Sequence, residues 1–163
     1  MTGLQLRAAQ PRDMETVFMM GFDVWRDGLS REEYLAACQI SPKFEKGKWW
    51  VLETAEGKIM SSLITYSLAK GVVGLGSIAT DYEFRKQGFA SELIRQVITY
   101  LEGSKAVQAF FLFSDIDPTF YEKLGFGVVG RRVPGHPHTV CMVRPDNIRH
   151  LYGEDGYSLP SYF

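Results

Sequence analysis

The sequence predicts an α/β fold, in the α+β sense, with a central mixed, mostly antiparallel sheet of about seven strands and four helices. Two patterns indicate this class: short apolar segments rich in β-branched and aromatic residues recur along the chain, and a long amphipathic segment lies between two of them. The chain has 163 residues, 45% of them hydrophobic, which suffices for one substantial core but is short for two domains. We therefore expect residues 1–163 to form a single domain.

The expected strands are short segments that either alternate between apolar and polar residues or are apolar throughout. They are Leu4–Ala8, Trp49–Thr54, Ile59–Ala69, Val72–Thr80, Val107–Phe113, Phe126–Gly130 and Thr139–Arg144. Glu56, Gly57 and Lys58 separate the second strand from the third, which predicts a hairpin. The last two strands are expected to close the sheet as an antiparallel pair.

The four expected helices begin at Pro11, at Ser30, at Phe89 and at Asp117–Pro118. Ser30 followed by Glu33 is a capping-box pattern, which fixes the start of the second helix. The third helix is the clearest, because its apolar residues form one wide face that ends at Gly103. It connects two strands, and such a crossover joins parallel strands with a right-handed connection. The fourth and fifth strands are therefore expected to be parallel.

Charge and composition exclude several functional classes. The formal net charge is -1, so no global positive field attracts nucleic acid or an anionic membrane. Cys38 and Cys141 are too few for a disulfide framework, and no apolar run reaches the roughly 20 residues that cross a bilayer. No signal segment precedes the first strand, so we expect a cytoplasmic protein. His136 and His138 with Cys141 form an incomplete ligand set, and we expect no metal.

The segment from Arg85 to Ser91 is the strongest candidate for a binding site. It lies between the end of a strand and the start of the best helix, where backbone amides lack partners and the helix dipole is positive. Gly88 allows an anion to approach the backbone closely, and Arg85 and Lys86 add positive charge. This arrangement suits a diphosphate held mainly by backbone amides.

Two motifs resemble those of the GNAT superfamily of acetyl-CoA-dependent N-acyltransferases. Arg85, Gly88 and Ala90 match the family pattern of Arg or Gln, two residues, Gly, one residue, then Gly or Ala. Tyr121 followed by Leu-Gly-Phe at residues 124–126 matches a second hallmark. The order of the expected elements from Leu4 to Arg144 also fits. The resemblance implies a GNAT-like sheet whose fourth and fifth strands splay apart, with residues 146–163 as an extension beyond the family core.

The resemblance also implies where acetyl-CoA binds. Ile78, Ala79 and Thr80 match the strand end whose backbone pairs with pantetheine, and Ser114 stands where many members have a cofactor-binding Asn. Gly74 and Gly76 are suited to a strand with a bulge that opens the space for the thioester. The pyrophosphate loop comprises Arg85, Lys86, Gln87, Gly88, Phe89, Ala90 and Ser91.

For catalysis, the resemblance assigns Tyr121 as the general acid that protonates the departing thiolate. The general base is less defined, because Ala109 stands where some members carry a glutamate. Asp115, just after the fifth strand, is the leading candidate, and removal of the proton through water is the competing explanation.

The acceptor is expected to be a small-molecule or peptide primary amine. By the resemblance, its site lies between the first two helices, which supply Trp25, Asp27, Glu32 and Tyr34, and the loop between the last strands, which supplies Arg131, Arg132 and His136. The acidic residues suit a polyamine or a lysine side chain, and the arginines suit an amino acid carboxylate. A regulatory domain that binds acyl-CoA without turnover remains the alternative function.

The extension is unusually aromatic, with Tyr152, Tyr157, Tyr162 and Phe163. A disordered end is normally poor in aromatic residues, so we expect this segment to dock. Its two candidate positions are the acceptor cleft and a second subunit of a homodimer.

Overall fold

The computed structural model describes residues 3–133, 135–152, 160 and 163, but not the side chains of residues 130–133. Contacts between residues divide the chain into two compact units. Unit 1 comprises Met1–Tyr66 and Ser77–Tyr100, and unit 2 comprises Ser67–Gly76 and Leu101–Phe163. In the described residues, no helix combines the length and the apolar character that crossing a membrane requires.

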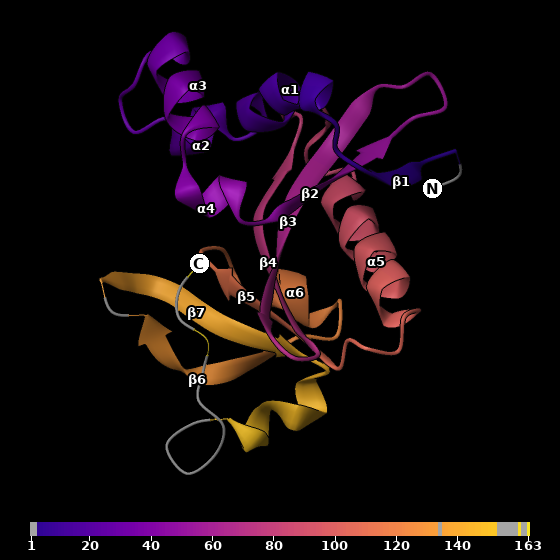
Figure 1. The fold of residues 1–163 in the computed structure, drawn as a ribbon. Helices are drawn as coiled ribbons and strands as arrows, with labels where there is room; N and C mark the ends of the chain where they lie inside the picture. The colour runs from indigo at the N-terminus through magenta and orange to yellow at the C-terminus, as the bar shows by residue number, and fades with distance from the viewer. Residues whose placement is uncertain (1–2, 134, 153–159, 161–162) are drawn as a thin grey trace. The chain divides into compact units, whose positions relative to one another are not determined.

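The strands agree closely with the segments expected from the sequence. They are β1 (Gln5–Ala8), β2 (Lys48–Glu53), β3 (Ile59–Ala69), β4 (Val72–Thr80), β5 (Ala109–Ser114), β6 (Gly127–Val133) and β7 (His136–Arg144). Hydrogen bonds order them β1-β2-β3-β4-β5-β7-β6 in one sheet (Figure 1). Strands β4 and β5 are parallel, while the pairs β1–β2, β2–β3, β5–β7 and β6–β7 are antiparallel. The expected mixed sheet is therefore confirmed.

The α-helices are α1 (Met14–Met19), α2 (Phe22–Trp25), α3 (Arg31–Gln39), α4 (Pro42–Glu45), α5 (Phe89–Glu102) and α6 (Thr119–Glu122). Shorter 3-10 segments are η1 (Pro11–Asp13), η2 (Tyr82–Phe84) and η3 (Asp146–Leu151). Ser30 caps the start of α3 as expected, since its hydroxyl accepts a hydrogen bond from the Glu33 amide at 3.2 Å.

The region before β2 is divided into more helices than the two expected there. The chain breaks between α1 and α2 at Gly21, where an added Cβ would lie 1.9 Å from the Trp25 ring. Helix α4 is an unexpected turn that Ser41 caps, with Pro42 at its first position. Ser followed by Pro is a recognised start of a helix and was the sequence signal for it.

In unit 1, alternation along β2 directs side chains to opposite faces of the sheet. Trp49 lies edge-on to Phe18 of α1 and Phe44 of α4, with ring centroids 6.0 and 5.2 Å away. The next residue, Trp50, instead contacts Tyr100 of α5 at 5.3 Å. Helices α1 and α4 therefore cover one face of these strands, and α5 covers the other (Figure 1).

Unit 2 is built around an apolar cluster on β5 and β7. Phe111, Cys141 and Val143 are buried, and Tyr152 and Phe163 from the C-terminal extension pack against the same cluster. The Tyr152 ring lies 4.9 Å from that of Phe111. The described aromatic residues of the extension are thus docked, as expected, while Tyr157 and Tyr162 lie outside the described residues.

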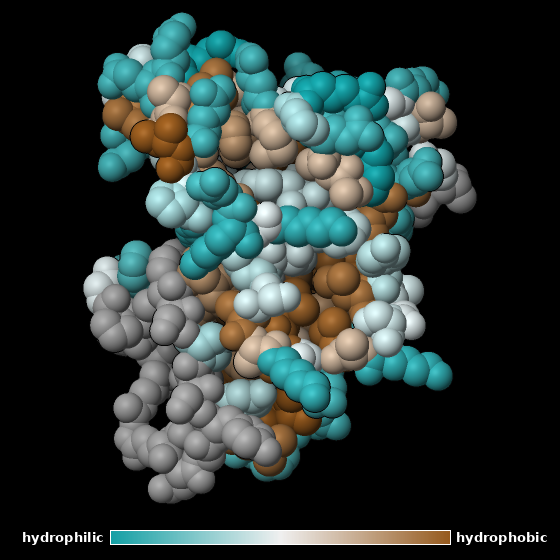
Figure 2. All heavy atoms as spheres, in the orientation of Figure 1, coloured by the Kyte–Doolittle hydropathy of each residue, from teal (hydrophilic) through white to brown (hydrophobic). Residues whose placement is uncertain are grey.

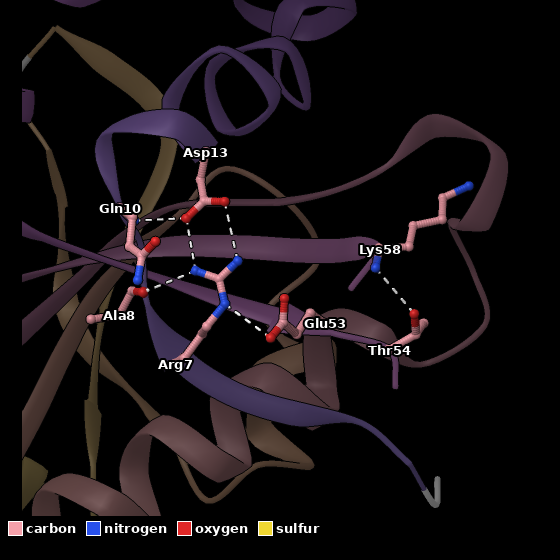
Figure 3. Close-up of polar contacts among 7 residues, drawn as sticks. All are labelled: Arg7, Ala8, Gln10, Asp13, Glu53, Thr54 and Lys58. Carbon is pink, nitrogen blue, oxygen red and sulfur yellow. Dashed lines mark hydrogen bonds and ion pairs between the residues drawn. The ribbon is translucent and has the colours of Figure 1, made fainter. Parts of the chain in front are cut away.

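A charged cluster fixes the first strand to its neighbours in unit 1 (Figure 3). Arg7 of β1 donates two hydrogen bonds to Asp13, at 2.7 and 3.1 Å, and forms an ion pair with Glu53 of β2 at 3.0 Å. Asp13 also accepts a hydrogen bond from the backbone amide of Gln10 at 2.7 Å. Its side chain is only 7% exposed, and the bond from Arg7 holds the pKa of Asp13 below its ordinary value.

We predict that Asp13→Asn lowers the free energy of unfolding by about 2 kcal/mol at pH 7, because hydrogen bonds to a charged partner are lost. A carboxylate whose folded-state pKa is depressed stabilises the protein above its unfolded pKa of about 3.9, and this contribution disappears as the pH falls through the folded-state pKa. Urea unfolding should therefore show wild type and variant converging below about pH 4. Glu15→Gln is the control, because it removes only the exposed Glu15–Arg31 pair. Equal stabilities of Asp13→Asn and wild type at pH 7 would contradict the prediction.

Candidate functional site

The loop before α5 presents a run of unpaired backbone amides. The first helical hydrogen bond of α5 joins the Glu92 amide to the Gly88 carbonyl at 3.0 Å. Among the described residues, the amides from Lys86 to Ser91 donate no hydrogen bond to the protein. Lys86, Gln87 and Gly88 are exposed. These amides are therefore open to an external acceptor, at the end of the helix where the dipole is positive.

Two residues in the left-handed backbone region shape this loop. Lys86 has φ 64° and Gly88 has φ 89°. Glycine adopts such a conformation at little cost, whereas a side chain is strained there. Successive amides in a loop of this kind form a concave surface suited to anions.

Arg85, expected to supply mobile positive charge, is instead held by the protein. Its guanidinium donates to both carboxylate oxygens of Asp23 at 2.6 and 2.7 Å. The remaining bonds are to the carbonyl of Met20 at 3.0 Å and the carbonyl of Thr80 at 3.1 Å. Four of the five N–H donors of an arginine are thereby used. Arg85 fixes the end of β4 to the junction of α1 and α2, all within unit 1.

The sequence contains no signal for this arrangement, because Asp23 precedes Arg85 by 62 residues. Asp23 lies on α2 and is partly exposed, and the bond from Arg85 holds its pKa below the ordinary value. Its carboxylate is thus neutralised within the protein. The pair is bidentate, which is the strongest geometry for an arginine and a carboxylate.

The end of β4 departs from regular strand geometry, although not at the glycines expected. Ser77 adopts φ 46°, which is left-handed and rare for a residue with a side chain. The register of β4 with β5 runs from Val72–Ala109 to Leu75–Leu112, while β4 continues to Thr80. The irregularity therefore follows the last β4–β5 pair, which agrees with the expected splay of these strands.

The three residues assigned to pantetheine lie at this end of β4. The carbonyl of Ala79 accepts a hydrogen bond from the Ser61 hydroxyl at 2.7 Å, and the Thr80 hydroxyl lies 3.2 Å from the same Ser61 oxygen. Ile78 and Ala79 are partly buried and Thr80 is buried. Ser61 of β3 thus holds the strand end in place.

In unit 2, the structure brings the two proposed catalytic residues within electrostatic range of each other. Tyr121 of α6 is buried, and its ring contacts Phe120 and Phe126. Burial, with a smaller contribution from the negative charge of Asp115, raises the pKa of Tyr121 to about 12. The phenol therefore keeps its proton at neutral pH.

Asp115 and Ser114 follow one another at the end of β5 but have different surroundings. Asp115 is exposed and accepts a short hydrogen bond from the Thr139 hydroxyl. The Ser114 hydroxyl donates to the carbonyl of Ile116 at 2.8 Å, so it closes a local turn of its own. Asp115 is thus the more accessible of the two.

The acceptor candidates are only partly described. Trp25 is 43% exposed but lies against Gly21, and Asp27 is exposed in a left-handed turn with φ 50°. Tyr34, grouped with them from the sequence, is buried and donates to the carbonyl of Phe18 at 2.8 Å. Arg131 and Arg132 lie on β6, but their side chains are outside the described part.

The surface around these helices is mixed in character. Hydrophobic patches interrupt the hydrophilic surface around α2 and α3 (Figure 2). Val24 and Ile40 are exposed on this part of unit 1, at 64% and 79%. Within the described residues, no group of three or more His, Cys, Asp or Glu side chains is placed to hold a metal ion.

Comparison with known proteins agrees with this geometry. A family model described as an acetyltransferase (GNAT) domain matches residues 45–128, which is 84 of the 163 residues. The chain therefore belongs to the GNAT acetyltransferase family, as the sequence motifs indicated. A comparison with curated protein sequences gave no significant match.

Solved structures of acetyltransferases share the fold at low sequence identity. A chimera of spermidine N-acetyltransferase SpeG from Vibrio cholerae and hSSAT has a TM-score of 0.70 and 16% identity, covering 91% of this chain and 99% of the other. A putative N-acetyltransferase from Lactobacillus plantarum has a TM-score of 0.69 and 17% identity, with 87% and 97% covered. A GNAT-family acetyltransferase from Staphylococcus aureus Mu50 has a TM-score of 0.64 and 14% identity, with 86% and 98% covered.

We predict that Asp23 and Arg85 are energetically coupled by about 1 kcal/mol or more, the range found for charged residues in direct contact. Asp23→Ala and Arg85→Ala should each destabilise the protein, and the double variant should be little worse than either. A double-mutant cycle measured by chemical denaturation tests this. Strict additivity would show that Arg85 is a mobile cation rather than part of the scaffold.

Proposed function

We propose that the protein is an N-acetyltransferase that transfers an acetyl group from acetyl-CoA directly to a primary amine. The observation that carries the proposal is the run of unpaired amides from Lys86 to Ser91, beginning at exposed residues, in a chain of the GNAT family. In this role, the amides bind the diphosphate of CoA through the backbone. The side chain of Lys86, exposed beside them, adds positive charge.

The reaction requires one bond to form and one to break at the thioester carbonyl carbon. The neutral amine nitrogen attacks this carbon, and collapse of the tetrahedral intermediate breaks the carbon–sulfur bond. The nitrogen loses a proton and the thiolate gains one, so an ammonium acceptor yields an amide, free CoA and one proton. An alkyl amine has a reference pKa near 10.4, so a base must deprotonate it at neutral pH.

In the proposed mechanism, Tyr121 donates the proton to the thiolate. Its raised pKa supports this role, because the group stays protonated and available as a donor. Asp115 is the proposed base, since it is an exposed carboxylate close enough to influence Tyr121. Proton removal through water remains the competing route. Stabilisation of the oxyanion by backbone donors near Thr80 completes the proposal.

The proposed acceptor class is a cationic amine, such as a polyamine or a lysine side chain. Asp23 is already neutralised by Arg85, so the exposed carboxylates Asp27 and Glu32 carry this proposal. One of the solved structures above bears on it, and only through its printed name, a chimera of spermidine N-acetyltransferase. An amino acid bound through its carboxylate to Arg131 or Arg132 is the second candidate.

The deciding experiment measures the release of free CoA thiol from acetyl-CoA across a panel of amines. The panel contains spermidine, Nα-acetyl-lysine and free amino acids, with a no-amine control. Amine-dependent release supports the enzyme, and its rank order separates the two acceptor classes. Binding of acetyl-CoA without amine-dependent release would instead support a regulatory domain.

We predict that Gly88→Glu abolishes CoA binding, whereas Gly88→Gln weakens it less. Both variants impose the same backbone strain at φ 89°, so the comparison isolates the repulsion between the carboxylate and the diphosphate. The difference in affinity, measured by calorimetry, should be at least about tenfold, or roughly 1.4 kcal/mol. Equal CoA affinity in the two folded variants would show that the diphosphate does not bind to this loop.

We predict that Tyr121→Phe lowers kcat by about one to two powers of ten, the lower end of general acid catalysis. Thiolate is already a tolerable leaving group, and the substitution keeps the ring packing, so CoA affinity and thermal stability should change little. The ratio of wild-type to variant rates should stay constant from pH 7 to about pH 10, because the Tyr121 pKa is near 12. If the variant turns over at the wild-type rate under conditions where chemistry limits turnover, then Tyr121 serves only in packing.

A further inference from the structure

The carboxylate of Asp23 is joined to the loop of unpaired amides, although its charge is the same as that of an anionic ligand. Asp23 lies on α2, and both of its carboxylate oxygens accept hydrogen bonds from the Arg85 guanidinium, at 2.6 and 2.7 Å. Arg85 immediately precedes the run of amides that begins at Lys86. Both side chains and the loop belong to unit 1. Charge alone disfavours a carboxylate at this position, so its presence requires another explanation.

The position of Asp23 is fixed by the packing of α2. The ring of Phe22, the preceding residue, contacts that of Tyr34 with centroids 5.2 Å apart, and Tyr34 is buried. Trp25, on the same helix, covers Gly21. Isolated helices of four residues are unstable in water, so these contacts hold α2 in place. Asp23 is therefore a fixed acceptor for the guanidinium.

The Arg85 side chain is bound on several sides within unit 1. Besides Asp23, it donates to the carbonyls of Met20 at 3.0 Å and of Thr80 at 3.1 Å. Its central carbon lies 5.2 Å from the centroid of the Tyr82 ring. Exposed ion pairs usually contribute little, but a bidentate pair with further hydrogen bonds holds a defined geometry. The start of the loop is therefore anchored to α2 and to the end of β4.

The loop needs such an anchor because its own conformation is strained. Lys86, next to Arg85, has φ 64°, a left-handed conformation that is disfavoured by roughly tenfold for a residue with a side chain. Strain of this kind persists where the surrounding structure enforces it. Among the described residues, the amides from Lys86 to Ser91 donate no hydrogen bond that could do so. The contacts of Arg85 fix the residue beside the strained one.

We propose that Asp23 is a positioning residue for the diphosphate site, which it maintains by holding Arg85 and thereby the loop. The inference rests on the proposed function, in which the amides of this loop bind the diphosphate of CoA. Release of Arg85 lets Lys86 leave the left-handed region, and the concave array of amides is lost. A ligand must then reorder the loop as it binds, which lowers its affinity.

This role predicts an effect opposite in sign to that of the Asp23 charge. If Arg85 were a mobile cation for the ligand, loss of the Asp23 carboxylate would free it and strengthen the binding of a diphosphate. If Asp23 positions the loop, the same loss weakens binding. Relaxation of the Lys86 conformation alone corresponds to a fall in affinity of about tenfold.

Asp13 provides a matched control. It also accepts two hydrogen bonds from one arginine within unit 1, at 2.7 and 3.1 Å from Arg7 (Figure 3). Its cluster joins β1 to β2 rather than to the loop before α5. Asp13→Asn and Asp23→Asn each remove one negative charge and keep the shape of the side chain. A general effect of charge or of lower stability would therefore appear in both variants.

The test measures the affinity of CoA by calorimetry in wild type, Asp23→Asn, Arg85→Lys, the double variant and Asp13→Asn. Asp23→Asn should bind CoA about tenfold more weakly, and Asp13→Asn should bind it as wild type does. Arg85→Lys keeps the positive charge but loses the planar fork, so it should weaken binding to a similar extent. It decides the question if Asp23→Asn fails to fold. The double variant should be little weaker than either single variant, because each breaks the same contact.

Equal or tighter CoA binding by a folded Asp23→Asn variant overturns the inference, as does an equal loss of affinity in Asp13→Asn. These outcomes are distinct from failure of the proposed function. If wild type binds CoA but shows no amine-dependent release of the thiol, the proposed enzyme fails, and the affinities still decide the role of Asp23. Absence of CoA binding by wild type would overturn both.

Discussion

The parallel pairing of β4 with β5 is the constraint on which the rest of the structure depends. Parallel neighbours cannot be joined by a tight turn, so the chain must return over the sheet, and α5 provides this return. The loop that leaves β4 then leads directly into the first turn of α5. The unpaired amides from Lys86 to Ser91 are thus a consequence of the topology, and Gly88 gives the loop the conformation that exposes them.

The same pairing is also short. The register ends at Leu75–Leu112, after which Ser77 turns into the left-handed region. Such local strain persists where the surrounding structure enforces it, and it is common at functional sites. Within the paired region, Gly74 makes room for Phe163. Regular strand pairing therefore does not account for two positions of β4, Gly74 and Ser77.

Arg85 illustrates how a motif residue can have a different role from the one its position indicates. Its place beside a run of unpaired amides suggests a cation for an anionic ligand, but Asp23 and two carbonyls occupy its donors. The loop consequently offers mainly backbone amides, whose position the Arg85 contacts help to fix. The guanidinium stabilises the scaffold of the site, and binding of a diphosphate does not require it to move.

The sequence by itself determined the strands, the parallel pair, the capped start of α3, the loop that leads into α5 and the family, because each depends on local periodicity or on residues close together in the chain. It also indicated a docked aromatic extension from composition. Only the tertiary structure decided the partners of Arg85, the burial of Tyr121, the position of the strand irregularity at Ser77 and the contact of Phe163 with Gly74. These contacts join residues far apart in the sequence, where no local pattern records which side chain will meet which.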